Sequence, residues 1–262
     1  MSIDGLFSDL AFTLRHCPSV VVSLLSFCFC AVAVRFFGRH FGYAGLCAYM
    51  VVVGIISNIQ ALYATSYELL NMAVLLGAPV FCSSFLACDL INLEHGAAKA
   101  KNAVYLSMFM NVLFIASMIL TLGHKPIDYA QYPAFGISKE TMDANIGAME
   151  QLFTPLPRIL IASYAAYLVS QLSEIWLFNA VNRIRCLKSE IVKHNISLFI
   201  SNVCLDTLVF TLVGMWILAS EPLTLMDIWQ VCSASIAIRI ICNFGISIYM
   251  KWHKHVSAGM VK

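Results

Sequence analysis

Charged residues are scarce in this chain. They make up 11% of its 262 residues, and the formal net charge at pH 7 is +2. Soluble domains carry about 25% charged residues, so this composition excludes an ordinary water-soluble protein. The net charge is also too small to indicate a nucleic-acid partner. Apolar residues take the place of charge, because 60% of the chain is hydrophobic and its mean hydropathy is +0.82.

Motifs of catalysis and metal binding are missing as well. The sequence contains no HExxH, no Gly-x-Ser-x-Gly and no Walker A pattern, which argues against an intramembrane enzyme. It has no CxxC and no Cys/His cluster with zinc spacing. Nine of its ten cysteines lie within or beside apolar runs, the tenth being Cys186, and such cysteines are usually small buried hydrophobes. We therefore expect no enzyme activity, no cofactor and no metal site.

Long apolar runs dominate the chain. About 20 residues suffice for a helix to cross a hydrocarbon core of about 30 Å. Backbone groups in lipid must pair internally, and alternating strands are absent, so helices rather than a barrel are indicated. The runs of spanning length are 17–37, 43–66, 69–88, 102–123, 157–179, 195–219 and 228–250. We predict an all-α, polytopic integral membrane helical bundle, with residues 1–262 forming a single transmembrane domain.

The first run is predicted to be a retained helix rather than a cleaved signal peptide. The leader before it contains Asp4, Asp9 and Arg15. This is the wrong charge for the basic start of a signal peptide.

Lysine and arginine are distributed unevenly between the two ends of these runs. Cytoplasmic loops of membrane proteins carry an excess of both residues. The poorer set of loops holds Arg15, Lys125, Lys139 and Arg158. The richer set holds Arg35, Arg39, Lys99, Lys101, Arg183, Arg185, Lys188, Lys193, Lys251, Lys254 and Lys262. This asymmetry predicts an N-terminus outside the cytoplasm, a cytoplasmic C-terminus and an extracytoplasmic loop at 124–156.

The 124–156 loop contains an amphipathic segment. Met142, Ile146, Met149 and Phe153 fall on one face at helical spacing. We predict an interfacial helix that lies on the outer surface of the membrane. The alternative is a gate over a binding site.

Polar side chains within the apolar runs are the best functional clue. They are costly in lipid and usually face the interior of a bundle or a cavity. Residues three or four apart share a helical face, as do Gln171 with Glu174, and Asn202 with Asp206. The full set of candidates is Asn58, Asp89, Glu94, Gln171, Glu174, Asn202, Asp206 and Arg239.

Two of these candidates are predicted to lie at the same depth. Asp206 comes 11 residues after the start of its run at 195, and Arg239 comes 11 residues after 228. At about 1.5 Å of rise per residue, both are about 16 Å deep, near the midplane. An ion pair between them is therefore allowed. It either holds two helices together or belongs to a polar substrate pocket, and polar residues on five runs favour the pocket.

Several segments resemble the bacterial queuosine precursor transporters, the YhhQ-type or vitamin uptake transporter family. The resemblance covers about residues 50–250. It is carried by SNIQALY, APVFCSSFLACDLINLEHGAAKAK, EQLFTPLPRILIASYAAYLVSQLSEIWLFNAVNRI and HNISLFISNVCLDTLVFTLVGMW. The resemblance implies a six-helix core in the bacterial inner membrane, with one extra N-terminal transmembrane helix here. Glu174 stands where members of the family often carry aspartate.

The resemblance implies import of 7-deazaguanine compounds such as preQ0, preQ1 or queuine for tRNA modification. The partners are then this small molecule and the lipid bilayer, without nucleic acid, and no oligomeric state is predicted. We expect substrate contacts from Asp206, Asn202, Glu174, Gln171, Asn58 and Arg239, and structural or gating roles for Asp89, Glu94 and Arg158. A flat base also needs an aromatic face, and Tyr164, Tyr167, Trp176 and Phe210 are available. The alternative function is the substrate-binding subunit of an energy-coupling-factor type vitamin transporter.

Overall fold

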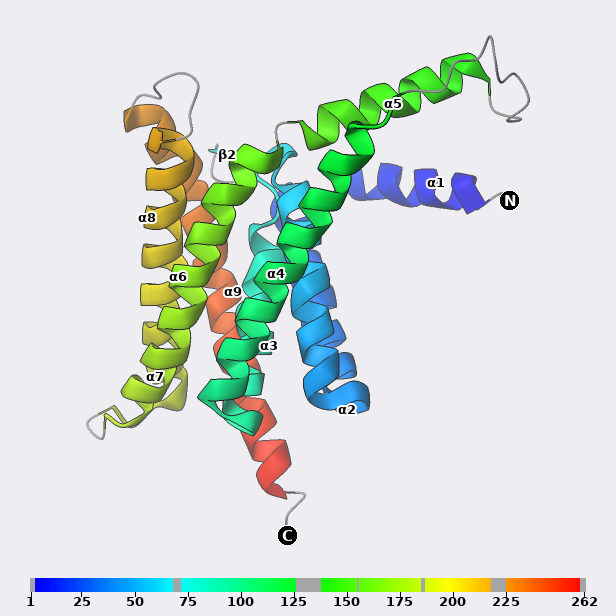
Figure 1. The fold of residues 1–262 in the computed structure, drawn as a ribbon. Coiled ribbons are helices and arrows are strands. Elements are labelled where there is room, and N and C mark those ends of the chain that lie inside the picture. Colours follow the sequence, from blue (N-terminus) through cyan, green and yellow to red (C-terminus); the bar gives the residue numbers. More distant parts are fainter. Residues whose placement is uncertain are drawn as a thin grey trace.

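The apolar runs fold into long helices that lie side by side in the computed structural model (Figure 1). The structure describes residues 3–67, 72–125, 138–154, 156–184, 187–217 and 225–259. Its helices are α1 (Ile3–Arg15), α2 (Ser19–Gln60), α3 (Ala78–His95), α4 (Ala97–Leu122), α5 (Lys139–Phe153), α6 (Leu156–Asn182), α7 (Glu190–Leu198), α8 (Asp206–Phe210) and α9 (Leu225–Gly259). Two π-helical segments, η2 (Phe199–Leu205) and η3 (Thr211–Ile217), continue α7 and α8.

The outside of the bundle is as apolar as its inside. Large side chains such as Phe29, Phe109 and Trp176 are 75%, 76% and 68% exposed, whereas Asp89, Gln171 and Glu174 are fully buried. This inversion suits a protein whose solvent is lipid. Among the described residues, α2, α4 and the segment Glu190–Gly214 are long and apolar enough to cross a membrane. The all-α prediction is confirmed at this level.

Helix α2 contains the first two predicted runs. Its helical geometry breaks at Gly42, where φ is +55°, a value that favours glycine because it has no Cβ. Both ends of α2 lie at one end of the bundle, since Ser19 hydrogen-bonds Thr65 at 3.1 Å while Gln60 directly precedes the same hairpin. The chain therefore descends, turns back at Gly42 and ascends.

A small hairpin separates α2 from α3, where the sequence predicted two helices, 43–66 and 69–88, joined directly by a short connection. Strands β1 (Ala64–Tyr67) and β2 (Met72–Leu75) pair antiparallel, with Ala64 opposite Leu75 and Tyr67 opposite Met72. This corrects the predicted boundaries at 66 and 69, because α2 ends at Gln60 and α3 begins at Ala78. Tyr67 anchors the hairpin from a buried position, where its hydroxyl donates to Ser23 at 2.8 Å.

Helix α5 lies within the predicted 124–156 loop. Ser138 caps it by accepting a hydrogen bond from the N–H of Thr141 at 3.2 Å. Hydrogen bonds from its own backbone and from Ser138 lower the pKa of Glu140 below its ordinary value. Phe153 is buried and Met149 packs in the same cluster, together with side chains of α4 and α6. Figure 1 shows α5 extending across one end of the bundle.

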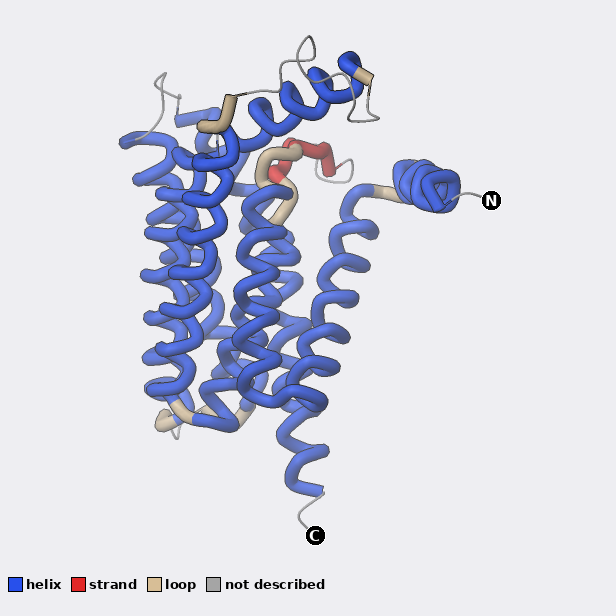
Figure 2. The backbone as a smooth tube through the Cα atoms, turned by 45° about the vertical axis from the view of Figure 1, so that its right-hand side comes forward, coloured by secondary structure: helices blue, strands red, loops and turns tan. Residues whose placement is uncertain are grey.

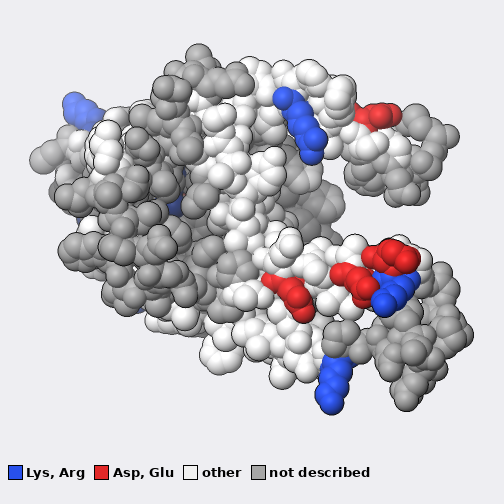
Figure 3. Space-filling model, turned by 90° about the horizontal axis from the view of Figure 1, so that it is seen from above, with Lys and Arg blue, Asp and Glu red and all other residues white. Residues whose placement is uncertain are grey.

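The two ends of the bundle differ in charge, as the sequence predicted. One end, which we call the hairpin end, carries the β1–β2 hairpin, α1 and α5; Figure 2 shows α1 projecting sideways from it. Seen from above, the charged side chains that are described at that end lie mainly on two projecting lobes (Figure 3). The opposite, basic end holds the α3–α4 turn, the start of α7 and the end of α9 (Figure 1). Lys99, Lys101, Lys188, Lys193, Lys251 and Lys254 belong to these segments.

Candidate functional site

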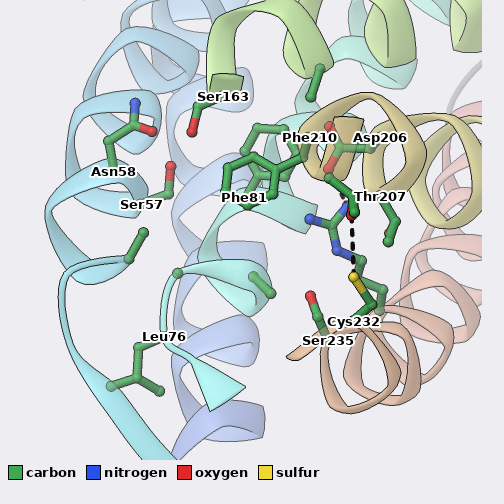
Figure 4. A pocket seen from close by; sticks show the side chains of 16 residues that line it. Ser57, Asn58, Leu76, Phe81, Ser163, Asp206, Thr207, Phe210, Cys232 and Ser235 are labelled. Atoms are coloured by element: carbon green, nitrogen blue, oxygen red, sulfur yellow. Dashed lines mark hydrogen bonds and ion pairs between the residues drawn. The ribbon is translucent and has the colours of Figure 1, made fainter. Parts of the chain in front are cut away.

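A cavity of about 100 Å³ lies between α2, α3, α6, α8 and α9. It has room for several waters or a small planar group. Figure 4 shows Ser57, Asn58 and Ser163 on one side, Asp206, Thr207, Cys232 and Ser235 on the other, and the rings of Phe81 and Phe210 between them. The remaining lining residues are Ala61, Leu76, Gly77, Ala78, Ala166, Thr211 and Arg239.

Asp206 and Arg239 form an ion pair at the wall of this cavity. Arg239 Nη1 donates to Asp206 Oδ2, and Ser170 Oγ donates to Asp206 Oδ1 at 3.1 Å. The carboxylate is 3% exposed, so both charges are held away from solvent. Burying a charge in this way is tolerable only when partners surround it. The structure therefore supplies the partner that an aspartate in an apolar run requires.

Asn202 of η2 adds further contacts to α9 beside the ion pair. Arg239 Nη1 also donates to Asn202 O at 2.7 Å and to Asn202 Oδ1 at 3.1 Å. The Asn202 amide donates to Asn243 Oδ1 at 2.7 Å. Asn202 does not line the cavity but orients the guanidinium that does.

Hydrogen-bonding capacity remains free beside the cavity. In the described part of the chain, Arg239 Nε and Thr207 Oγ1 are buried without a partner, and both residues line the cavity. Buried polar groups without partners are costly. A bound polar molecule of suitable shape could satisfy them.

The aromatic side chains differ from the expected set. Phe210 lines the cavity as expected, and Tyr164 and Tyr167 line a smaller adjoining space of about 20 Å³. Trp176 was a wrong expectation, because it is 68% exposed on the outside of the bundle. Sequence reasoning missed Phe81. The Arg239 guanidinium lies over its ring, 5.7 Å from the ring centroid.

Gln171 and Glu174 lie outside the cavity, toward the basic end. Gln171 Nε2 donates to Ser84 Oγ at 2.9 Å. Both oxygens of Glu174 accept hydrogen bonds, one from Ser197 at 2.6 Å and one from Ser201. The structure thus separates these two candidates from Asp206, Arg239 and Asn58.

Glu174 belongs to a second polar cluster, which the sequence did not reveal. Asp89 Oδ2 lies 2.8 Å from His194 Nε2, and acceptor atoms of Asp89, Glu174 and His194 all lie within 4.8 Å of one another. Among the described residues these three are close enough to share a bound cation. Sequence spacing gave no signal, because the three residues come from α3, α6 and α7.

The last two candidates lie at opposite ends of the bundle. Glu94 lies in the last turn of α3 at the basic end, 3.3 Å from His253 and 3.8 Å from His95. Arg158 belongs to the first turns of α6, and its side chain lies outside the described residues.

A family model described as "Putative vitamin uptake transporter" matches residues 75–252. The chain belongs to the vitamin uptake transporter family. The match begins at the last residue of β2 and continues through α3 to residue 252 in α9. It therefore contains the cavity walls formed by α3, α6, α8 and α9. Together with its apolar helices, this membership makes the chain a multi-pass membrane protein.

The chain is also similar to a curated bacterial protein. The chain is 26% identical over 155 residues to a protein of Bacillus subtilis (strain 168) named "Probable queuosine precursor transporter". The aligned part is 58% of this chain and 60% of that relative, so the chain spans about three fifths of the relative's length. No solved structure matches the chain.

Proposed function

We propose that this chain imports queuosine precursors, 7-deazaguanine compounds such as preQ0, preQ1 or queuine, across the bacterial inner membrane for tRNA modification. The observation that carries the proposal is the cavity, where the buried Asp206–Arg239 pair meets Phe81 and Phe210 within a transporter bundle. The relative's name supports the same class of cargo.

The chemistry of the cavity suits a deazaguanine base. Such a base offers N1–H and an exocyclic amine as donors and O6 as an acceptor, and its flat face stacks on aromatic rings. The Asp206 carboxylate and the Asn58 amide oxygen can accept from the donors, and Thr207 or Ser163 can donate to O6. Arg239 donates to Asp206 and holds its carboxylate at the cavity wall beside the base.

The proposed arrangement in the membrane follows from the basic-residue asymmetry. The hairpin end faces outward with the N-terminus, and the basic end and the C-terminus face the cytoplasm. The family match begins at residue 75 and leaves out both arms of α2. The second arm lines the cavity with Ser57 and Asn58, so we assign it to a six-helix core and the first arm to an extra helix. The cavity then lies below the hairpin, on the path of an incoming solute.

Uptake in a host that cannot synthesise queuosine tests the proposal. Expression of this chain, with preQ0, preQ1 or queuine supplied at low concentration, is expected to restore queuosine in tRNA. Asp206→Asn should abolish the effect at equal protein level, whereas the same change at the exposed Asp9 should not. Failure of all three compounds in the presence of inserted protein would refute the proposal.

The same experiment distinguishes this proposal from the alternative, a substrate-binding subunit of an energy-coupling-factor transporter. Such a subunit needs partner ATPases for uptake. Restoration by this chain alone, in a host without those partners, supports the secondary transporter. Binding without uptake would favour the subunit.

A further inference from the structure

The cluster of Asp89, Glu174 and His194, which we call the acid–histidine cluster, is buried and isolated from fixed positive charge. Asp89 and Glu174 are 0% exposed and His194 is 7% exposed. Among the described residues, neither carboxylate has a Lys or Arg within ion-pair distance, in contrast to Asp206. Two ionised carboxylates close together in an apolar interior repel each other strongly. A bound cation, either a proton or a metal ion, must therefore neutralise part of this charge.

The charged groups that surround the cluster do not provide that neutralisation. Lys254 and Lys251 of α9 line a small space together with His194, but the Lys254 ammonium is bonded to Glu190 at 3.3 Å. Cys88, beside Asp89 on α3, is a buried thiol. Lys254 is thus engaged with Glu190, and Lys251 is exposed at the basic end.

The hydrogen bonds of the cluster favour a proton over a metal ion. Asp89 Oδ2 and His194 Nε2 are 2.8 Å apart, a distance at which the two atoms share a hydrogen. Both Glu174 oxygens accept from Ser197 and Ser201. Metal ligands instead point their lone pairs at a common centre about 2 Å away. Here those lone pairs point at hydrogens.

Two further atoms indicate that the cluster exchanges protons. Within the described ranges, Asp89 Oδ1 and His194 Nδ1 are buried without a hydrogen-bond partner. His194 also lines a space of about 10 Å³ with Glu190, Lys251 and Lys254, which is enough for about one water molecule. A proton can therefore pass between water at the basic end and the imidazole.

We propose that the acid–histidine cluster is the site at which a coupling proton binds during transport. This inference rests on the proposed function, because it assigns the ion that drives import. The proton comes from water on the outer side, binds the Glu174 or Asp89 carboxylate, and leaves through His194 to water at the basic end. No bond other than O–H or N–H forms or breaks.

The structure connects this cluster to the cavity through two helices. Ser201, which donates to Glu174, is followed directly by Asn202, which accepts from Arg239. On α6, Ser170 donates to Asp206 one turn before Glu174. Protonation of Glu174 weakens the Ser197 and Ser201 hydrogen bonds, since a neutral carboxyl is a poorer acceptor. The change reaches both partners of the Asp206–Arg239 pair through neighbouring residues.

Transport by purified full-length protein in liposomes tests the coupling. With preQ1, preQ0 or queuine as probe, an inward pH gradient should drive accumulation and the probe should drive proton entry, read with an internal pH dye. Without a pH gradient, Glu174→Gln should exchange the probe at a rate within about threefold of the wild type. With the gradient, it should no longer accumulate the probe. Glu174→Asp should keep both, and Glu150→Gln on exposed α5 is the matched control. Accumulation driven by sodium, or by the pH gradient in Glu174→Gln, would overturn the proposal.

A measurement without substrate separates this inference from the proposed function. Infrared difference spectra between acid and alkaline pH should contain the band of a buried protonated carboxyl. The band should disappear in Glu174→Gln or Asp89→Asn and persist in Glu150→Gln. Failure of every probe with this band present would refute only the cargo, whereas absence of the band in the wild type refutes the proton site. If Glu174→Gln does not insert, Glu174→Asp and Asp89→Asn give the same decision through a shifted or lost band.

Discussion

Asp206 shows how a single charge is accommodated within an apolar helix. An isolated aspartate at the centre of a bilayer costs about 3 kcal/mol or more on insertion scales. In the bundle, Arg239 of α9 and Ser170 of α6 both donate hydrogen bonds to the Asp206 carboxylate. The same geometry serves two roles, a bond between helices and the polar wall of the cavity.

A double substitution distinguishes these roles. Asp206→Asn alone leaves Arg239 buried without its anion, so we expect less folded protein and no uptake. Asp206→Asn with Arg239→Gln removes both charges and should restore expression to near the wild-type level. If uptake stays absent in that variant, Asp206 acts on the cargo. Recovery of uptake along with expression would show that the pair is structural.

Phe81 is expected to stack on the cargo. Base–aromatic stacking contributes about 1–3 kcal/mol per base, so Phe81→Leu should weaken probe binding roughly tenfold. Phe85→Leu, one turn along α3 in a fully buried core position, is the matched control. It should alter stability but not affinity, measured by probe binding to purified protein. Equal affinity in both variants would remove Phe81 from the site.

Individual residues were predictable from the sequence only where they contrast with their neighbours. Asp206, Arg239 and Asn58 stand out because polar residues in apolar runs are rare, and the structure places all three at one cavity. Phe81 gave no such contrast among apolar neighbours. The pairing of Asp89 with His194 joins residues 105 positions apart, which no local pattern encodes.

At the level of elements, the connection between the hairpin and α3 requires a glycine at position 77. Gly77 has φ +109°, and a Cβ there would lie 2.5 Å from the Ser57 carbonyl oxygen. Gly96, between α3 and α4, has φ +86° but open space around it.

These two glycines make a matched pair for mutation. Gly96→Ala should cost about 1–3 kcal/mol through backbone strain alone. Gly77→Ala adds a clash with backbone beside the cavity, so it should lower the thermal unfolding temperature further and reduce uptake. A Gly77→Ala protein as stable as Gly96→Ala would contradict this account. Thermal unfolding of purified protein in detergent is the measurement.

Element types followed from the sequence better than their boundaries did. The helices correspond to the predicted runs because their length and lack of charge leave few alternatives. The sequence places residues 64–66 and 69–75 within helical runs, since a short apolar run cannot be told from a strand by periodicity. Pairing with a partner strand decides between them, and that pairing is a tertiary property.

The orientation of the whole molecule can be tested with introduced cysteines. Lys139→Cys on α5 and Lys188→Cys before α7 are both exposed, at opposite ends of the bundle. A membrane-impermeant maleimide should label Lys139→Cys in intact cells and Lys188→Cys only after permeabilisation, as read by mass spectrometry of the modified peptide. The reverse pattern would invert the proposed topology, and with it the direction in which the cavity opens.

The π-helical turns of η2 have a consequence for the length of the chain. Each hydrogen bond of a π turn spans one residue more than that of an α turn. η2 therefore contains an extra residue that a regular α-helix of the same length does not need. Deleting one residue such as Cys204 from η2 can therefore convert it to α-helix while His194 before it and Asp206 after it keep their faces. A deletion within α4 has no such slack, and every later residue rotates by about 100°. We expect natural gain and loss of single residues in this bundle to concentrate at η2.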